Sequence, residues 1–591
     1  MFSKSTGKSR SRDMLHTSEV VTHQTVSTPA QRPMAVAPGS RVECGAAYSL
    51  FTRARLVRAY LRGWQVASTN GIGRRSFPRR GVHTTGDGPC QTLSRPSHLQ
   101  KTIPLARKAY FPPSSWTTSS LPAIMRAPDF LPIDFVVIGG GIAGLTSALA
   151  LTRVGHKVTV LDDGTYDYTP LAGGCRISPN TTKIYYRWGL EEKLKKVAIK
   201  SEGVLYAQSM QIDSGSFIGS HDWEEEFLNE TGGDFLLMHY SDLRIVLHDA
   251  AAEHGADLRS LSRVVSVNVD PERPSVTLES GEVLYADVLI GADGISGVCR
   301  PTVMRDAQQE DPLVFTDMML YSVVIPDTVE IPDQDTAIHM KQTGKVLTWI
   351  GEDYGMMGFP LGGTPEFGLF VYAPCPGNCT IEKLEVGRAR LKEVLKDCEP
   401  RLQALADLAS SVASVPMYEK PHLNDWVHPN GRLLVIGEAA HPLPPGSLYA
   451  LNMAAGDAAA LGRIFAHLHR KNQIKSFLNA VQEIRQKRIE VVQKTANGNI
   501  FAVSLPPGIA EARDKSLRAK AAAGVKALGT SSTYLEMQKV VEDIFAYDPE
   551  DEADDWWIQW GLTQERATRV VTKGEAAINI NVSEDLERLS L

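Results

Sequence analysis

The stretch Phe135-Val-Val-Ile-Gly-Gly-Gly-Ile-Ala-Gly144 decides the fold of this 591-residue chain. Apolar residues that favour β-strands run directly into three glycines, and Gly144 completes a Gly-x-Gly-x-x-Gly spacing. Small and apolar residues continue to Val154, and a second apolar run, residues 157–161, ends at Asp162. A strand, a glycine turn, a helix and a second strand in this order predict one βαβ unit.

Each glycine of this spacing has a mechanical reason to lack a side chain. Gly139 permits the tight turn, Gly141 lets the backbone approach a pyrophosphate, and Gly144 lets the helix pack on the strand. The N-terminus of the helix presents free N–H groups to phosphates. Asp162 stands 23 residues after Gly139, where a carboxylate accepts hydrogen bonds from ribose hydroxyls and repels a 2′-phosphate. The unit therefore predicts tightly bound FAD or NAD rather than NADP.

Two later segments also end an apolar strand in a carboxylate beside glycines. Residues 286–292 lead into Asp293-Gly294, and residues 431–436 lead into Gly437-Glu438. The second segment is followed by residues with apolar side chains at helical spacing. Glycines beside each carboxylate let a ligand come close to the backbone. These two segments distinguish a flavoprotein from an enzyme that only uses NAD.

Together the three motifs resemble those of the single-component, FAD-dependent aromatic hydroxylases, specifically the salicylate-hydroxylase-like monooxygenases of fungi. The resemblance covers about residues 132–562. It implies an α/β fold with a Rossmann-type, glutathione-reductase-like FAD-binding domain, an inserted mixed β-sheet substrate domain and C-terminal helices. It also implies non-covalent FAD, NAD(P)H and O₂ as co-substrates, hydroxylation through a peroxide at the flavin C4a carbon, and an aromatic or polyketide-like small molecule as substrate.

The resemblance assigns functional residues to each motif. The first motif would hold the ADP half of FAD, Asp293-Gly294 with Arg300 would lie where FAD and NAD(P)H meet, and Gly437-Glu438 would hold the ribityl part. The expected cofactor-binding residues are Gly139, Gly141, Gly144, Asp162, Gly174, Arg176, Asp293, Gly294, Arg300, Gly437, Glu438, Ala450 and Leu451. Asp293 and His441 are the candidates for a catalytic role, although no side chain acts as a covalent catalyst in flavin chemistry of this kind.

The chain departs from the family pattern on the cofactor side. Glu438 replaces the usual Asp, and its longer side chain still accepts hydrogen bonds. Tyr240 stands where the family usually has Arg, and Arg176 is the residue that could replace this charge. Tyr449 and Ala450 occupy a segment beside the isoalloxazine where Gln-Gly-Ala is usual. The added methyl group of Ala450 would point toward the ring or shift the loop.

The substrate side departs as well. Ser322 stands where many relatives carry Arg, and Phe359 where relatives often carry Tyr. Arg and Tyr would bind a phenolate or carboxylate by charge-assisted hydrogen bonds. A pocket without them is expected to prefer neutral phenols to salicylate, and equal binding of salicylate would point to another cation such as Arg176. A different alignment of this variable domain stays open as an alternative.

Two other functions remain open at this stage. A flavin dehydrogenase or oxidase would pass electrons on without inserting oxygen into a substrate. A non-catalytic FAD-binding relative is suggested by the departures at Tyr240, Ser322, Tyr449 and Ala450. Release of peroxide without a hydroxylated product would indicate the first, and absence of NAD(P)H oxidation would indicate the second.

The N-terminal part of the chain differs in composition from the rest. Residues 1–126 contain 19 Lys and Arg against four acidic residues, a net charge of +15 in a chain whose total is -6. They are rich in Ser, Thr, Pro and Arg and show no sustained strand or helix period. This predicts a disordered extension; an organelle transit peptide, or sequence upstream of a true start at Met125, are the alternatives.

The domain boundaries follow from these motifs. We expect the basic extension at residues 1–128 and the FAD-binding domain at 129–470. A substrate-covering β-domain at about 305–425 would interrupt the FAD-binding domain, with alternating runs at 319–325 and 368–372. A C-terminal helical region and tail would occupy residues 471–591.

Composition excludes several classes of protein. Hydrophobic residues make up 43% and charged residues 22% of the chain, as in ordinary soluble proteins, and the small net charge gives no reason to expect nucleic acid or an anionic membrane as partner. Seven cysteines are too few for a disulfide framework and favour a reducing compartment.

Cys375 and Cys379 lack a second Cys or His pair, so no metal is expected. The longest uncharged apolar stretch, residues 135–151, is shorter than a membrane span. We therefore expect a soluble cytoplasmic protein.

A chain shortened to begin at Met125 should fold and bind FAD as well as the full chain. The reason is that the removed segment has no apolar periodicity with which to join a core. Flavin absorbance per mole of protein and the temperature of thermal unfolding test this. Loss of soluble protein on truncation would contradict the interpretation of the segment as disordered.

Overall fold

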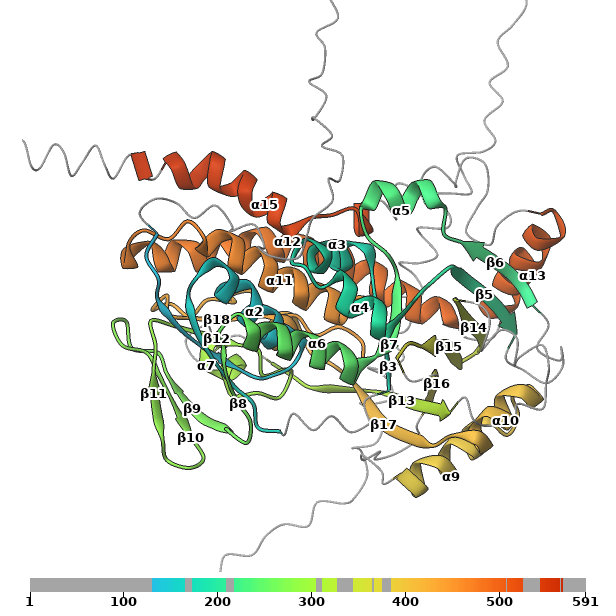
Figure 1. The fold of residues 1–591 in the computed structure, drawn as a ribbon. Coiled ribbons are helices and arrows are strands. Elements are labelled where there is room, and N and C mark those ends of the chain that lie inside the picture. Colours follow the sequence, from blue (N-terminus) through green and yellow to red (C-terminus); the bar gives the residue numbers. More distant parts are fainter. Residues whose placement is uncertain are drawn as a thin grey trace, which may run out of the picture. The chain divides into compact units, whose positions relative to one another are not determined.

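The predicted βαβ unit is present, and its first strand is the middle strand of a five-stranded parallel sheet; its helix is labelled α2 in Figure 1. It consists of strand β1 (Asp134–Ile138), helix α2 (Ile142–Val154) and strand β2 (Lys157–Leu161). Every residue of β1 after Asp134 is buried, and α2 is buried around most of its circumference. Gly155 ends α2 in a left-handed conformation with φ of 101°, which glycine adopts at little cost. Local sequence signals therefore set the end of this helix.

A computed structural model of the chain describes residues 130–164, 173–208, 217–304, 311–326, 344–363, 366–374, 384–505, 508–524, 543–563 and 565–566. All of them belong to one structural unit that spans Gly88–Leu591. The basic extension expected at residues 1–128 and the pair Cys375 and Cys379 lie outside the described residues.

A five-stranded parallel sheet surrounds β1 in the order β18-β12-β1-β2-β8. Its further strands are β8 (Asp257–Arg259), β12 (Val288–Gly291) and β18 (Leu433–Val435). Helix α2 packs on α6 (Tyr240–Glu253) and α11 (Ala450–Phe465). The carboxyl ends of parallel strands meet at one edge of a sheet, where such folds bind their ligands. The predicted motifs at Gly139, Asp162, Asp293 and Gly437 all follow strands that end at this edge.

Two small antiparallel sheets join the parallel one. One has the order β11-β10-β9, and the other has the order β3-β7-β4. Their strands are β9 (Val264–Asn268), β10 (Ser275–Leu278), β11 (Val283–Tyr285), β3 (Gly174–Ile177), β4 (Ala198–Lys200) and β7 (Leu236–His239). Short helices precede or follow them: α3 (Pro179–Arg187), α4 (Glu191–Val197), α5 (Glu225–Thr231) and α7 (Cys299–Met304). The segment that contains Gly174 and Arg176 thus lies on a strand.

A large mixed sheet forms the second layer, in the order β17-β13-β16-β15-β14-β5-β6. Its strands are β5 (Gly203–Gln208), β6 (Phe217–Asp222), β13 (Val314–Pro326), β14 (Lys345–Glu352), β15 (Gly355–Leu361), β16 (Glu366–Pro374) and β17 (Ser411–Glu419). The alternating runs expected at 319–325 and 368–372 lie on β13 and β16. Strands β5 and β6 precede the expected range 305–425 and join the sheet because β5 pairs in parallel with β14.

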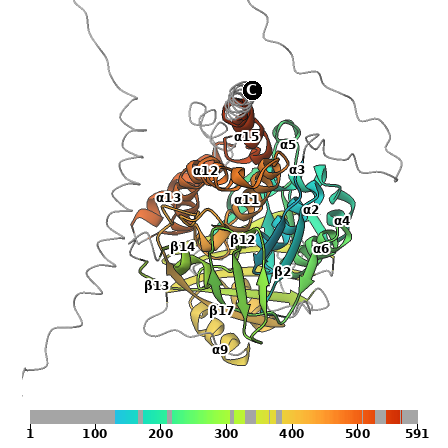
Figure 2. The same ribbon diagram turned by 90° about the vertical axis from the view of Figure 1, so that its left-hand side faces the viewer.

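The two faces of β13 serve different clusters of buried side chains. Met319, Tyr321 and Val323 pack with residues of α9 (Leu384–Leu395) and α10 (Pro400–Leu408). Leu320 and Val324 point to the opposite face, where they pack with aromatic residues of β15 and β16. In two views, α9 lies on the side of the sheet away from α11 (Figures 1 and 2), and Figure 1 shows α10 beside it. The period of two along β13 therefore leaves one face of the sheet for a site.

The C-terminal part is helical among the described residues, as expected. It contains α12 (Ile474–Val503), α13 (Ile509–Ala522), α15 (Pro549–Trp556) and a π-helical turn, Trp557–Gly561. Helix α12 packs on α11 and α15 through buried residues that include Phe477 and Val481. A two-residue strand, β19 (Ser504–Leu505), pairs with β14 and ties this region to the mixed sheet.

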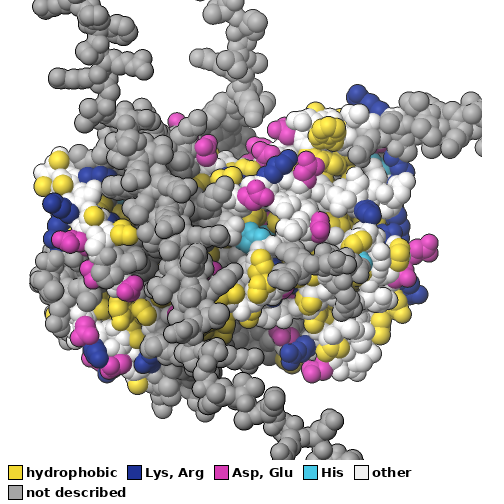
Figure 3. Space-filling model, turned by 180° about the vertical axis from the view of Figure 1, so that it is seen from behind, with side chains coloured by type: hydrophobic (Ala, Val, Ile, Leu, Met, Phe, Trp, Pro, Cys, Tyr) yellow, Lys and Arg dark blue, Asp and Glu magenta, His cyan; other side chains and the backbone are white. Residues whose placement is uncertain are grey.

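On the face seen in Figure 3, acidic, basic and apolar side chains of the described residues are interspersed. Within the part of the chain that the structure describes, no helix is both long enough and apolar enough to cross a bilayer.

Candidate functional site

A cavity of about 850 Å³ lies where the strand ends of the parallel sheet face the mixed sheet. Most of the residues predicted to bind the cofactor line it: Gly139, Gly141, Asp162, Gly174, Arg176, Asp293, Gly294, Glu438, Ala450 and Leu451. Residues from β13, β16 and β17 line its other side. The fold thus brings segments that are far apart in sequence around a single space. Gly144, Arg300, Gly437 and His441 are absent from its lining.

The glycines of the first motif divide into two kinds. Gly139 has φ of 107°, and a Cβ atom there would lie 2.3 Å from the carbonyl oxygen of Ala292. A Cβ atom at Gly144 would lie 1.9 Å from the carbonyl oxygen of Gly139, so both residues are glycine because backbone segments touch. Gly141 has an ordinary φ of -76°, and a Cβ atom there would meet no atom within 4 Å. Gly141 therefore borders open space at the start of α2, which fits a bound pyrophosphate.

Asp162 has a partner that the sequence did not indicate. The side chain of Arg244, on α6, donates from Nη2 to Oδ2 of Asp162 at 2.9 Å and to the carbonyl oxygen of Gly140 at 2.8 Å. Arg244 also lines the cavity, one helical turn after Tyr240. Residues four apart lie on the same face of a helix, and this spacing is the signal that could have identified Arg244. A cation therefore lies at the glycine turn although Tyr240 replaces the usual Arg.

Asp293 lies directly after β12 and lines the cavity. Its Oδ2 accepts a hydrogen bond from the backbone N–H of Cys299 at 2.9 Å. Its Oδ1 is buried and has no hydrogen-bond partner among the described residues. Burial raises the pKa of the carboxyl, and the hydrogen bond from Cys299 opposes this. A buried oxygen without a partner is costly in a finished site, so Asp293 fits a contact to a bound cofactor.

Glu438 follows β18 in a short 3₁₀ turn, Gly437–Ala439, and opens onto the same cavity. Its side chain is exposed toward this space, while desolvation by the surrounding protein raises the pKa of its carboxyl and His441 acts in the opposite direction. Gly437 has φ of 59°, which explains the glycine at the turn. The substitution of Glu for the usual Asp thus keeps a carboxylate at the cavity.

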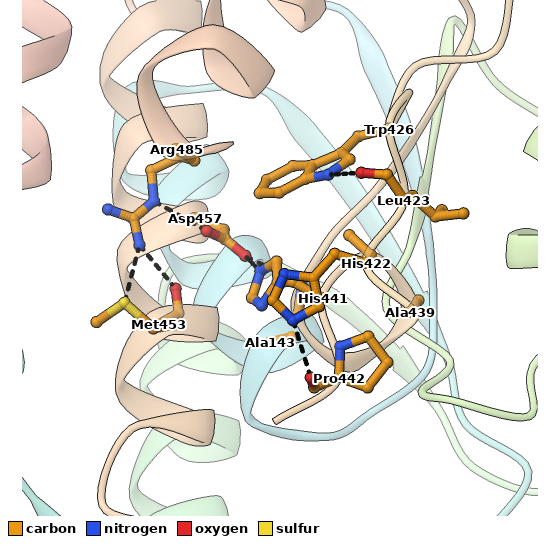
Figure 4. Close-up of polar contacts among 12 residues, drawn as sticks. Ala143, His422, Leu423, Trp426, Ala439, His441, Pro442, Met453, Asp457 and Arg485 are labelled. Atoms are coloured by element: carbon orange, nitrogen blue, oxygen red, sulfur yellow. Dashed lines mark hydrogen bonds and ion pairs between the residues drawn. The ribbon is translucent and has the colours of Figure 1, made fainter. Parts of the chain in front are cut away.

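The turn that carries Glu438 rests on a fully buried polar network (Figure 4). His441 Nε2 lies 2.6 Å from Oδ2 of Asp457, which also accepts the backbone N–H of Gly437 at 3.0 Å. Arg485 donates from Nε to the other oxygen of Asp457 at 2.9 Å and from Nη2 to the carbonyl oxygen of Met453. Burial raises the pKa of Asp457, but His441 and Arg485 outweigh it, so the pKa lies below its ordinary value.

Two predicted residues therefore take positions away from the cavity. His441 is 1% exposed and turned toward Asp457, so it holds the loop and does not face a substrate. Arg300 is fully buried and pairs with Asp311 at 2.6 Å. It also donates to the carbonyl oxygens of Ala439 and Pro421. The guanidinium of Arg300 thus joins neighbouring loops outside the lining of the cavity. No local sequence pattern indicates Asp311 as its partner.

The mixed sheet supplies a mostly apolar wall to the cavity. Leu320, Phe370, Ala413 and Val415 line it together with Ser322. Phe359 is fully buried behind this wall and meets Phe370 edge to face, with ring centroids 5.5 Å apart. Arg176, the cation named above as an alternative to the missing Arg, lines the same cavity. Among the described residues, no group of His, Cys, Asp or Glu could hold a metal ion.

This fold and cavity correspond to those of a known family. A family described as an FAD binding domain matches residues 133–496. The chain therefore belongs to the family of FAD-binding proteins with this domain. It is 27% identical over 391 residues to the FAD-dependent monooxygenase OpS4 of Beauveria bassiana, covering 65% of this chain and 89% of that one. It is 25% identical to the 3-hydroxybenzoate 6-hydroxylase of Klebsiella oxytoca, covering 56% of this chain and 79% of that one.

Solved structures show the same fold. A salicylate hydroxylase substrate complex aligns with 72% of this chain and 97% of its own, at a TM-score of 0.55 and 18% identity. HpxO of Klebsiella pneumoniae, complexed with FAD and uric acid, aligns with 70% of this chain and 96% of its own, at a TM-score of 0.58 and 18% identity. The predicted α/β fold class, the resemblance to FAD-dependent hydroxylases and FAD as the cofactor are thereby confirmed.

Replacing Gly141 by Val should abolish FAD binding and leave the fold intact. The side chain would fill open space at the start of α2, where the pyrophosphate is expected, and the backbone at φ of -76° accepts a β-branched residue. The measurements are flavin absorbance after purification and circular dichroism of the apoprotein.

Gly144→Val is the matched control, because its side chain would collide with the backbone of Gly139 rather than with a ligand. It should lower the free energy of unfolding of the apoprotein by about 3 kcal/mol or more. Full flavin content in Gly141→Val would contradict the assignment of the pyrophosphate site.

Asp457→Asn should destabilise the protein by about 3 kcal/mol at neutral pH, because it leaves the charge of Arg485 buried without its partner. The pKa of Asp457 is below its ordinary value in the folded protein, so its contribution is present above the unfolded pKa of about 4 and is lost as the pH falls. The difference in the free energy of unfolding between the unmodified protein and Asp457→Asn should therefore be constant above about pH 5. It should become smaller as the pH falls below about 4.

Denaturant unfolding of the unmodified protein and of Asp457→Asn across this pH range measures the difference in the free energy of unfolding. The double variant Asp457→Asn with Arg485→Met should recover part of the loss, since it also removes the buried cation. A single variant within about 0.5 kcal/mol of the unmodified protein would contradict the role of the network.

Proposed function

We propose that the protein is an FAD-dependent monooxygenase that uses NAD(P)H and O₂ to hydroxylate an aromatic or polyketide-like small molecule. One observation carries the proposal: a single cavity joins the nucleotide-type strand ends at Gly141 and Asp162 to the apolar wall at Phe370. A ring placed against that wall would share the cavity with the cofactor. The named activities of the curated relatives support the same chemistry.

The residues of the chain would hold the cofactor from several sides. The N–H groups at the start of α2 would bind the pyrophosphate, and Asp162 would accept hydrogen bonds from ribose hydroxyls. Arg244 fixes the orientation of Asp162 through its ion pair. Asp293 and Glu438 would bind hydroxyl or ring N–H groups further along the cavity. When bound, FAD supplies hydride acceptance from NAD(P)H and the activation of O₂ for insertion into the substrate.

The mixed sheet would control access of water to the reacting ring. Its wall is formed by Leu320, Phe370, Ala413 and Val415, and every residue of the neighbouring strand β15 is buried. An apolar wall stacks against an aromatic substrate and keeps water away from it. The hydroxyl of Tyr372 donates to the carbonyl oxygen of Pro445 at 3.1 Å, and so holds the loop before α11 against the sheet.

The two alternatives have less support. The absence of Arg at position 240 is balanced by Arg244, which occupies the glycine turn with its cation. Ala450 begins α11 and lines the cavity, and a space of about 850 Å³ remains with this residue in place. These contacts favour a functional cofactor site over a non-catalytic relative, and the curated relatives named as monooxygenases favour oxygen insertion over an oxidase.

We also infer that the FAD-binding domain spans residues 129–470, that the substrate-covering sheet lies within it, and that a C-terminal helical region begins at residue 471.

The composition supports a cytoplasmic location, because the chain has few cysteines and no membrane-length apolar stretch.

Purified full-length protein should carry FAD and oxidise NAD(P)H faster when an aromatic substrate is present. A screen of phenols and ring acids should follow NAD(P)H absorbance, peroxide and product mass together, and a monooxygenase adds one oxygen atom to the product. Stimulated oxidation with peroxide in equal amount and no product of higher mass would instead indicate an oxidase. A yellow protein that never oxidises NADH or NADPH would contradict both enzymatic functions.

A further inference from the structure

Tyr449, one of the departures from the family pattern, is the N-cap of α11. It is 5% exposed and is absent from the lining of the cavity, although Ser447 before it and Ala450 after it both line that space. Its carbonyl oxygen accepts the backbone N–H of Met453 at 2.8 Å, in the first turn of the helix. The packing of the Tyr449 side chain therefore affects where α11 begins relative to the cavity.

The ring of Tyr449 packs on Phe545, in the segment that leads into α15. The two rings are nearly parallel, with an interplanar angle of 13° and centroids 6.4 Å apart. Phe545 is 6% exposed and meets Phe235 edge to face at 5.0 Å. Phe235 in turn stacks on Trp223 at 4.4 Å. Aromatic pairs in these arrangements stabilise a contact beyond the burial of their surface, so Phe545 joins Tyr449 to a packed aromatic group.

The backbone on both sides of Phe545 is held by cations from two helices. Arg488, on α12, donates to the carbonyl oxygen of Ile544. Lys183, on α3, donates to the carbonyl oxygen of Ala546 at 2.8 Å. Because both neighbours of Phe545 in the chain are held, the position of its ring is fixed by the body of the protein.

Ion pairs hold the next residues of the same segment. Arg187, on α3, pairs with Asp548 and, at 2.6 Å, with Glu550. The indole N–H of Trp188 donates to Glu550 at 2.9 Å. Burial raises the pKa of Asp548, but Arg187 and Lys183 outweigh it, so the pKa lies below its ordinary value. The C-terminal segment is therefore docked on α3 by charges, and Phe545 is part of a segment with a defined place.

We propose that Phe545 is a positioning residue for the cofactor. It holds the ring of Tyr449 and thereby directs the first turn of α11, with Ala450 and Leu451, at the cavity. The N–H groups of a first helical turn have no acceptor within the helix, and they favour negative charge beside them. The inference rests on the proposed function, since it concerns the FAD contacts expected at Ala450 and Leu451. It also gives Tyr449 a role in packing, although this departure from the family pattern suggested a non-catalytic relative.

The test measures FAD binding to the full-length protein and the visible circular dichroism of the flavin at saturating FAD. Phe545→Ala should raise the dissociation constant of FAD about tenfold, because Tyr449 loses its packing partner. It should also change the flavin dichroism at saturation, since that signal reports the surroundings of the bound ring and not the fraction of protein occupied. Phe545→Leu keeps an apolar side chain without the flat ring, and its values should fall between those of the unmodified protein and Phe545→Ala.

Trp557→Ala is the matched control in the same C-terminal segment. Trp557 is 8% exposed and stacks on His467 at 4.4 Å, just beyond the other end of α11. This variant should lower the temperature of thermal unfolding at least as much as Phe545→Ala does. It should leave the flavin dichroism unchanged and the dissociation constant of FAD within about twofold of the unmodified value, because it lies away from the start of the helix.

A double variant tests the route through Tyr449. Tyr449→Leu alone should reproduce the effects of Phe545→Ala on the dissociation constant of FAD and on the dichroism. Adding Phe545→Ala to Tyr449→Leu should then raise the dissociation constant by less than about twofold, since residues in contact are not additive. Full additivity of the two changes would overturn the proposal.

Two further outcomes would overturn it. One is an unchanged dissociation constant and dichroism in Phe545→Ala. The other is an equal change of both in Trp557→Ala, which would indicate a general loss of stability. If Phe545→Ala does not fold, Phe545→Leu takes its place, and a flavin dichroism identical to that of the unmodified protein would contradict the positioning role.

Failure of the proposed function would look different, because none of these measurements involves turnover. A protein that binds FAD with the expected dependence on Phe545 and never oxidises NADH or NADPH would contradict the monooxygenase activity. The positioning role of Phe545 would be supported in that case.

Discussion

The close approach of two backbone segments, at Gly139 and Gly144, is the constraint on which the rest of the structure depends. With no Cβ atom at Gly144, helix α2 can start directly on the turn that ends β1. That contact directs the N-terminus of α2 at the cavity and places Gly141 at its border. Any larger side chain would separate helix and sheet and move the N–H groups away from the ligand.

A second constraint is the placement of full charges behind the cavity. Asp457 and Arg485 lie fully buried beneath the turn of Gly437, and the pair Arg300 and Asp311 joins neighbouring loops. Buried ion pairs of this kind contribute little net stability but strongly disfavour other arrangements, because each charge needs its partner. The loops that carry Glu438 are thus held in position by groups that do not line the cavity.

Local sequence patterns predicted the central unit and failed where distant contacts decide. The βαβ unit, the strand ends at Asp293 and Gly437 and the alternating runs of β13 and β16 were all visible as short patterns. The pairing of β5 with β14 joins residues more than 130 positions apart, and no local period encodes it. The roles of Arg300 and His441 were predicted from motif position, yet their actual partners come from other loops and helices. Of the partners that the sequence analysis missed, Arg244 is the one that a local pattern could have indicated, because it follows Tyr240 by four residues on the same helix.

The alternation along β13 has a consequence for how such a protein can change. Met319, Tyr321 and Val323 are committed to the packing under α9 and α10, whereas Leu320 and Ser322 face the cavity. Leu320 belongs to a different cluster of buried side chains from Met319, Tyr321 and Val323. Substitutions at Leu320 and Ser322 would therefore change the wall of the cavity while the packing under α9 and α10 keeps its side chains. One face of strand β13 thus belongs to the packed core, and the other face belongs to the wall of the cavity, where a change of residue changes the shape offered to a substrate.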